Sequence, residues 1–345
     1  MDTLFDIELV NRMPAHQAKE FVHELVMNMT DEQAKKLLVL WANQQVSAEV
    51  INNQNYPLDR TRASKEFESL IGLEETKAYL TKQISYSKLK KSATLRGKYI
   101  GDISNNMVFI GNPGTCKTTV AKILAKRLYE EGVTNKPTLV EVSRAEIVSK
   151  YAGHTAKNVK QIFKKAIGGV LFIDEAYSLV EHDGRDGFGE EALNTLLQEV
   201  EKHRNDLVVI LAGYPEEMNE FLNLNPGLKS RFSQVVSFKD YTSEELYEIA
   251  KRIAEQNGFI IRKDVKDKLI PIFDKAVQEK NFGNGRFVRN LVEQAELTRA
   301  ENLSRRHKSF DGIANEELFT LIPDDFEAPK CVAEHVVKNK MGFRV

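Results

Sequence analysis

Gly111-Asn-Pro-Gly-Thr-Cys-Lys-Thr118 is the stretch of sequence that decides the fold. An apolar run at residues 107–110 precedes it, and a helical pattern over residues 120–129 follows it. A glycine-rich turn between a strand and a helix directs backbone N–H groups and the positive end of the helix dipole towards phosphate oxygens. The stretch therefore predicts a phosphate-binding loop.

The loop has the spacing of a Walker A motif, so its side chains have expected roles. Lys117 should reach the β- and γ-phosphates of ATP, and Thr118 should ligate Mg²⁺. The remaining contacts with the nucleotide should come from Pro113, Gly114, Thr115, Cys116 and Thr119. A glycine-rich turn that holds no nucleotide is the alternative interpretation.

Cys116 is a departure from this motif, which has glycine before the lysine. If the position requires a positive φ, a side chain there strains the backbone by on the order of 1–3 kcal/mol. A side chain could also crowd the phosphates. We expect the departure to affect the rate of hydrolysis more than the fold. The thiol also raises the alternative of a redox-sensitive site.

Asp174 and Glu175 directly follow another apolar run, residues 170–173. Their separation from Lys117 leaves room for a helix, a strand and a second helix, as an alternating α/β fold needs. Asp174 should hold Mg²⁺, usually through water, and Glu175 should orient and polarise the water that attacks ATP. A strand that ends in a solvated acidic turn is the alternative.

Short apolar runs alternate with helical patterns between residues 104 and 240. The runs lie at 107–110, 138–142, 170–173, 207–211 and 235–238. Three of them are entirely apolar, which is typical of strands covered on both faces. The pattern predicts an α/β fold with a parallel sheet flanked by helices, and ligands at the carboxyl ends of the strands.

Helical patterns flank this region on both sides. Residues 1–60 predict an N-terminal helical domain with an apolar stripe around Trp41, a candidate adaptor for a partner. Residues 241–330 predict a helical lid, opened by a capping box at 242–245. We therefore divide the chain into residues 1–60, a nucleotide-binding domain at 61–240, the lid at 241–330 and a tail at 331–345.

The bulk composition narrows the class of protein. The chain has 345 residues, of which 42% are hydrophobic and 29% charged, with a net charge of -1 and 2 cysteines. These values predict a cytoplasmic globular protein without a disulfide framework, a membrane span or a bulk attraction to nucleic acid. A basic run at residues 82–98 is read as a solvated helix face, with a polyanion contact as the alternative.

Further motifs occur in a fixed order along the chain. They are Ile71-Gly-Leu73, Lys150-Tyr-Ala-Gly153, Phe172-Ile-Asp-Glu-Ala-Tyr177, Leu211-Ala-Gly-Tyr-Pro215, and the segments 225–232 and 283–290. Together with the phosphate loop they resemble the AAA+ ATPases, and within them the CbxX/CfxQ family, which includes red-type Rubisco activases and stage V sporulation protein K. The likeness covers roughly residues 67–305.

The resemblance implies a hexameric ring of identical subunits with ATP between them. Ile71 and Gly72 match the segment that packs on adenine. Arg231 matches the arginine finger that stabilises γ-phosphate charge in the neighbouring subunit, and Lys229 is a weaker candidate for that role. A surface ion pair is the alternative for Arg231.

The resemblance also assigns residues that report on the nucleotide or grip a client. Arg286 matches the sensor-2 position of the lid, with Arg289 as the competing choice. Tyr151 matches an aromatic pore loop. No Asn or Thr stands after residues 207–211, where a polar sensor-1 residue is expected, so that role has no assignment.

Three functions remain in competition. The first is an ATP-driven machine that remodels a protein client of unknown identity through a hexameric ring. The second is a nucleotide-gated assembly or switch that binds ATP but hydrolyses it slowly, which Cys116 favours. The third, a motor directed to nucleic acid, is disfavoured by the near-neutral charge.

Overall fold

The computed structural model describes residues 62–101, 104–149, 154–180, 188–280 and 282–327. All of them belong to one compact unit, Arg60–Val345. The expectations for the N-terminal domain, for Tyr151 and for the tail at 331–345 lie outside the described residues. Among the described residues, none of the helices is long and apolar enough to cross a membrane.

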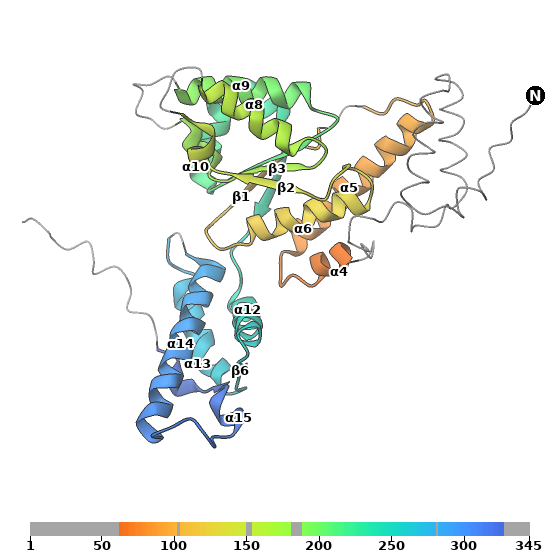
Figure 1. Ribbon diagram of the computed structural model, residues 1–345. Coiled ribbons are helices and arrows are strands. Elements are labelled where there is room, and N and C mark those ends of the chain that lie inside the picture. Colours follow the sequence, from red (N-terminus) through yellow and green to blue (C-terminus); the bar gives the residue numbers. More distant parts are fainter. Residues whose placement is uncertain (1–61, 102–103, 150–153, 181–187, 281, 328–345) are drawn as a thin grey trace, which may run out of the picture. The chain divides into compact units, whose positions relative to one another are not determined.

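A five-stranded parallel sheet forms the centre of this unit (Figure 1). Its strands stand in the order β2-β3-β4-β1-β5. They span Met107–Gly111 (β1), Leu139–Val142 (β2), Val170–Ile173 (β3), Val208–Gly213 (β4) and Gln234–Phe238 (β5). Each apolar run of the sequence became one of these strands, so the predicted parallel α/β fold is confirmed.

Helices cover both faces of the sheet. Successive residues of a strand point to opposite faces, so Leu171 and Phe172 belong to different hydrophobic clusters. The helices of the nucleotide-binding region are α4 (Arg62–Glu68), α5 (Glu74–Leu95), α6 (Lys117–Glu130), α7 (Arg144–Ile147), α8 (His154–Ala166), α9 (Phe188–Lys202), α10 (Pro215–Leu224) and α11 (Pro226–Arg231), with the 3-10 turn η1 (Ala176–Val180). Helices α8 and α9 lie side by side on one face (Figure 1), and α5 and α6 contribute to the cluster on the other.

A helical region follows β5 and has its own hydrophobic cluster. It consists of α12 (Ser243–Gln256), α13 (Val265–Ala276), α14 (Asn284–Arg306) and α15 (Asn315–Leu318), with the short parallel strands β6 (Ile260–Ile261) and β7 (Thr320–Leu321) and the turn η2 (Pro323–Asp325). The predicted capping box opens α12, since the backbone N–H of Glu245 donates to Thr242 Oγ1 at 3.2 Å. In return the backbone N–H of Thr242 donates to Glu245 Oε2 at 2.8 Å.

Asn284 joins the phosphate loop, the end of β5 and the start of α14. Its side chain is fully buried and its φ is 45°. The amide Nδ2 donates to Asp240 Oδ1 at 2.7 Å and lies 3.3 Å from the carbonyl oxygen of Pro113, while Oδ1 accepts from the backbone N–H of Tyr241 at 3.0 Å. Asp240 also accepts a hydrogen bond from the side chain of Asn112 in the phosphate loop. One buried amide therefore connects three segments that are far apart in the sequence.

The loop and the helical region also meet backbone to backbone. The N–H of Gly285 donates to the carbonyl oxygen of Gly114 at 3.1 Å. A Cβ on Gly114 would lie 2.2 Å from the carbonyl oxygen of Gly283, and the φ of Gly114 is 74°. Gly114 is therefore required both by its conformation and by this close approach.

We expect Asn284→Ala to lower the free energy of unfolding by about 2–4 kcal/mol, because it leaves buried polar groups unpaired and places alanine at a positive φ. Asn284→Gly relieves the backbone strain but still removes the hydrogen bonds. Its free energy of unfolding should therefore be about 1–3 kcal/mol lower than that of the native chain. Denaturant unfolding measures both values. The exposed Asn290 on the same helix is the control, and Asn290→Ala should stay within about 0.5 kcal/mol of the native chain. An Asn284→Gly variant as stable as the native chain would contradict the assigned hydrogen bonds.

Candidate nucleotide site

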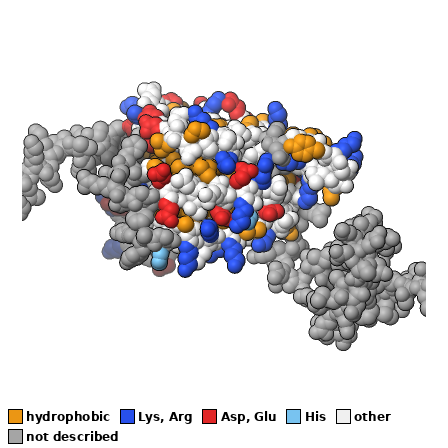
Figure 2. All heavy atoms as spheres, turned by 90° about the horizontal axis from the view of Figure 1, so that it is seen from above, with side chains coloured by type: hydrophobic (Ala, Val, Ile, Leu, Met, Phe, Trp, Pro, Cys, Tyr) orange, Lys and Arg blue, Asp and Glu red, His pale blue; other side chains and the backbone are white. Residues whose placement is uncertain are grey.

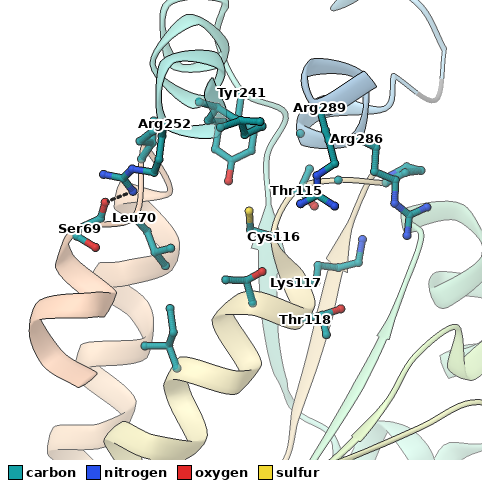
Figure 3. Close-up of a pocket in the computed structure, with 18 of the residues that line it drawn as sticks. Ser69, Leu70, Thr115, Cys116, Lys117, Thr118, Tyr241, Arg252, Arg286 and Arg289 are labelled. Atoms are coloured by element: carbon teal, nitrogen blue, oxygen red, sulfur yellow. Dashed lines mark hydrogen bonds between the residues drawn. The ribbon is translucent and has the colours of Figure 1, made fainter. Parts of the chain in front are cut away.

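A cavity of about 550 Å³ lies at the carboxyl edge of the sheet (Figure 3). The phosphate loop, the end of β3, the segment before α5 and helices α12 and α14 all contribute to its lining. Most of the residues predicted from the sequence line it together: Ile71, Pro113, Gly114, Thr115, Cys116, Lys117, Thr118, Thr119, Asp174, Glu175 and Arg286. Gly72 and Arg231 are not among the lining residues.

Lys117 is the first residue of α6 and is buried. Its Nζ donates to the carbonyl oxygens of Gly111 at 2.6 Å and Asn112 at 2.9 Å. Burial lowers the pKa of Lys117 to about 8, although the carboxylates of Asp174 and Glu175 act in the opposite direction. A cation in this position faces the cavity with its charge only partly offset, which favours an anionic ligand.

Cys116 has φ 65° and ψ 20°, so the residue before the lysine does adopt the left-handed conformation that glycine favours. Its side chain packs at the junction of two hydrophobic clusters. Figure 3 shows its sulfur directed towards the hydroxyl of Tyr241. Burial raises the pKa of Tyr241, and interactions with Cys116, including a side-chain hydrogen bond, raise it further. The backbone strain is therefore present, and the thiol has a packing site beside the lid region.

Asp174 and Glu175 directly follow the strand β3, as the sequence predicted. Glu175 has a positive φ of 48°, and its backbone N–H donates to Asp174 Oδ1 at 3.0 Å. The Glu175 carboxylate accepts a hydrogen bond from the hydroxyl of Tyr214 at 3.2 Å. Both carboxylates line the same cavity as Lys117.

The residues present fit a magnesium ion. The hydroxyl of Thr118 and the carboxylate of Asp174 line one cavity and are oxygen ligands of the kind that Mg²⁺ prefers. Within the part of the chain that the structure describes, no group of three or more His, Cys, Asp or Glu side chains could hold a metal ion. The two donors, Thr118 and Asp174, suit Mg²⁺, which commonly uses one or two protein ligands and takes the others from substrate phosphates and water.

The lining of the cavity also has an apolar part. Its members include Leu70, Ile71, Ile123, Ile249 and Ile253. An aromatic base would find dispersion contacts on several sides in such surroundings.

Gly72 does not line the cavity, and its contact with adenine stays a prediction. It has a φ of 61°, and a Cβ there would lie 2.2 Å from Glu245 Oε1 in the capping box of α12. Gly72 therefore lets the segment before α5 approach the lid helix closely.

Two arginines of α14, Arg286 and Arg289, line the cavity (Figure 3). Both side chains belong to exposed residues. Arg286 is close enough to Lys117 to lower its pKa electrostatically. The structure therefore brings both sensor-2 candidates to the site and puts Arg286 in electrostatic contact with the lysine.

Arg231 lies at the end of α11, away from the lining of this cavity. Its Nε is 3.2 Å from Glu201 Oε2 on α9, and its NH1 donates to the carbonyl oxygen of Gly227 at 3.4 Å. Lys229 is exposed. Arg231 is therefore not placed to contact a nucleotide in the cavity of its own chain.

Sequence reasoning missed two polar contributors. Tyr214 directly follows β4 and reaches Glu175, but the polar residue expected after this strand is an Asn or Thr. Arg252 on α12 lines the cavity and donates to the carbonyl oxygen of Ser69 at 2.7 Å. For Tyr214 the usable signal was its position at the carboxyl end of the strand next to β3. Arg252 carries no comparable signal, because it is one of several charges on an amphipathic helix.

Comparisons with known proteins show the family to which the chain belongs. The model for the AAA family, "ATPase family associated with various cellular activities", matches residues 107–240, and the AAA lid domain model matches residues 242–335. Stage V sporulation protein K of Bacillus subtilis is 40% identical over 243 residues, which cover 69% of this chain and 75% of that protein.

Two further relatives carry other names. A CfxQ homolog of Galdieria sulphuraria is 41% identical over 220 residues, covering 64% of this chain and 72% of that protein. The ESX-3 secretion system protein EccA3 of Mycolicibacterium smegmatis is 36% identical over 278 residues, which cover 77% of this chain but 45% of that protein.

The pKa of Lys117 leads to a pH prediction. Because this pKa is lowered from 10.5 to about 8, the folded chain loses the lysine proton in a range where the unfolded chain keeps it. Burial of the charged lysine therefore lowers the free energy of unfolding below about pH 8. This loss of stability is relieved as the pH rises towards 10.5. ATP needs the protonated lysine, so its affinity should be steady below about pH 8 and then fall by up to about tenfold per pH unit.

Titration with a fluorescent ATP analogue between pH 7 and 9.5 measures this effect. Lys117→Met is the control, and it should bind weakly without the alkaline decline. A native affinity that is constant up to pH 9.5 would show that the Lys117 proton is not lost in this range.

Proposed function

Because the chain belongs to the AAA family of ATPases, we propose that it binds ATP with Mg²⁺ and uses hydrolysis to remodel a protein client. The observation that carries this proposal is the single cavity that gathers Lys117, Thr118, Asp174, Glu175 and Arg286. These residues supply a cation for the phosphates, two oxygen ligands for a metal ion, a carboxylate for a water molecule and a second cation from the lid region. That set matches what phosphoryl transfer to water requires.

Each group has a role that follows from its chemistry. Lys117 holds the β- and γ-phosphates by charge, and Thr118 and Asp174 hold Mg²⁺, Asp174 through water. When bound, Mg²⁺ neutralises charge on the phosphate oxygens. Glu175 orients the attacking water and polarises it. Arg286, with Arg289 as the competing choice, contacts the γ-phosphate, and Ile71 contacts the base.

We propose that the functional form is a ring of this chain, a hexamer by the family resemblance, with Arg231 acting on the nucleotide of its neighbour. Two facts support an action in trans: Arg231 does not line its own cavity, and it is held at the end of α11 by Glu201. An arginine supplied by a neighbour accelerates related phosphoryl transfers by about 10³–10⁵.

The client has no assignment. The relatives are named for sporulation, for CfxQ and for a secretion system, so their names give no common target. We propose Tyr151 as the residue that grips an extended chain in the ring, because an aromatic side chain packs against any sequence. Residues 1–60 are the proposed adaptor, residues 61–240 and 241–330 the nucleotide-binding and lid domains, and the cytoplasm the proposed location.

A nucleotide-gated switch is the second candidate, and the observation in its favour is the side chain of Cys116 in the phosphate loop, where the motif has glycine. A nucleic-acid motor has less support. In the basic run, Lys88 pairs with Glu131 at 2.6 Å and Lys91 donates to the carbonyl oxygen of Gly132. Figure 2 shows acidic and basic side chains interspersed on the face it presents. Charges that are already paired locally give little attraction to a polyanion.

The rate of ATP hydrolysis distinguishes the ATP-driven remodelling machine from the nucleotide-gated switch. We expect the native chain and Cys116→Gly to hydrolyse ATP at rates within about threefold of each other, because the loop already has the backbone conformation that glycine would adopt. Cys116→Ala keeps the Cβ but removes the thiol, and it should behave like the native chain. Glu175→Gln should bind ATP normally and lose at least about 100-fold in turnover.

Steady-state phosphate release with an ATP-binding titration measures these effects. Hydrolysis that begins only in Cys116→Gly would favour the switch. Persistent turnover in Glu175→Gln would remove Glu175 from the mechanism.

The action of Arg231 in trans is testable by mixing two inactive variants. Arg231→Ala should stay folded and lose about 10³-fold or more in turnover. A Glu175→Gln subunit still offers Arg231 to its neighbour, and an Arg231→Ala subunit still has an intact Glu175. Their mixture should therefore regain hydrolysis at mixed interfaces, whereas either variant alone should not. Lys229→Ala is the matched control and should remain active. Failure of the mixture to recover, in subunits shown to co-assemble, would contradict a finger supplied by the neighbour.

A further inference from the structure

Tyr214 makes a contact in the site that no motif of the chain assigned. Its hydroxyl donates to Glu175 Oε1 at 3.2 Å. Among the described residues, no other side chain has a hydrogen bond to this carboxylate. Glu175 is exposed, so its side chain has rotamer freedom that a catalytic base must lose before it can hold a water molecule in one place.

The sheet delivers Tyr214 to this position. Strands β3 and β4 are parallel neighbours, with Ile173 opposite Leu211. Glu175 follows the end of the first strand and Tyr214 the end of the second, so both side chains arise at the same edge. Tyr214 is also the N-cap residue of α10, and its carbonyl oxygen accepts from the N–H of Met218 at 2.9 Å.

The ring of Tyr214 is fixed by its neighbours. It packs against the ring of Tyr177, with the ring centroids 5.9 Å apart. This packing depends on Gly213, where a Cβ would lie 2.6 Å from Met218 Cγ and 2.8 Å from Tyr177 Cδ1. A glycine at the end of β4 therefore allows a rigid aromatic platform beside the cavity.

The same ring also faces the lysine of the phosphate loop. Lys117 Nζ lies 5.5 Å from the ring centroid, within the range of a cation–π interaction. Burial and the neighbouring Glu175 carboxylate raise the pKa of Tyr214, so the phenol keeps its proton at neutral pH and acts as a donor. One side chain thus contacts the group expected to hold the phosphates and the group expected to activate water.

We propose that Tyr214 is the positioning residue for Glu175: its hydroxyl fixes one carboxylate oxygen, which leaves the other to orient the attacking water. The inference rests on the proposed ATPase function. Tyr214 has no proton-transfer step of its own. It directly follows β4, where the family resemblance implies an Asn or Thr, and it reaches Glu175 through a longer side chain.

Tyr214→Phe is the decisive variant because it keeps the ring against Tyr177 and Lys117 and removes only the hydroxyl. We expect kcat for ATP hydrolysis to fall by about tenfold or more, while KM and the affinity for ATP stay within about twofold. Tyr177→Phe is the matched control, since it removes a hydroxyl from the adjacent ring, and its kcat should stay within about twofold of the native value. Tyr214→Leu also removes the ring and should in addition weaken ATP binding severalfold.

A double variant separates positioning from a general effect on the fold. In Glu175→Gln the carboxylate is gone, so adding Tyr214→Phe should change the residual single-turnover rate by less than about twofold. The proposal is overturned if Tyr214→Phe alone has the kcat of the native chain. It is also overturned if Tyr214→Phe lowers the rate by the same factor in the Glu175→Gln background as in the native chain. A native chain that binds ATP but hydrolyses none in single-turnover measurements would overturn the ATPase proposal and this role with it. Unchanged turnover in Tyr214→Phe alone would leave the ATPase proposal intact.

Discussion

The parallel pairing of β1 with both β4 and β5 is the constraint on which the rest of the site depends. It places the phosphate loop between the carboxyl ends of β4 and β5, beside Tyr214, which directly follows β4. Strand β3 pairs with the other side of β4 and brings Asp174 and Glu175 to the same edge. Because all five strands run the same way, every carboxyl end contributes to one surface, and the amino ends are left out of the chemistry.

The helical region completes that surface through a small number of buried contacts. Asn284 holds the phosphate loop and the end of β5 to the start of α14, the helix that carries Arg286. Asn tolerates a left-handed backbone better than most residues and also supplies a donor and an acceptor. Both properties are used here, since its φ is positive and its side chain has partners in three segments. A change in the loop therefore has a direct route to the arginines of α14.

The sequence predicts the sheet and most of the cavity because both depend on local signals. Apolar runs of four or five residues mark strands buried on two faces, and a glycine-rich turn between strand and helix marks a phosphate loop. Asp174 and Glu175 follow from their place at the end of such a run. Tyr214 and Asn284 were missed because their roles depend on pairing partners that are distant along the chain. For Gly72, the resemblance predicted a contact with the base. Its positive φ and its close approach to Glu245 depend on the position of the lid helix, which no local signal in the sequence gives.

Cys116 shows how a departure from a motif is accommodated. A left-handed backbone costs a residue other than glycine about 1–2 kcal/mol. Glycine would avoid that strain but would lose more conformational freedom on folding, and it could not fill the space between the two hydrophobic clusters that Cys116 contacts. These effects are opposite in sign and therefore partly offset each other in the stability of the loop. The sulfur is directed towards Tyr241 in the segment that leads into the lid helices. The consequence of cysteine is therefore expected less at the phosphates than at the junction of the phosphate loop with the lid, where it adds a packing contact that glycine lacks.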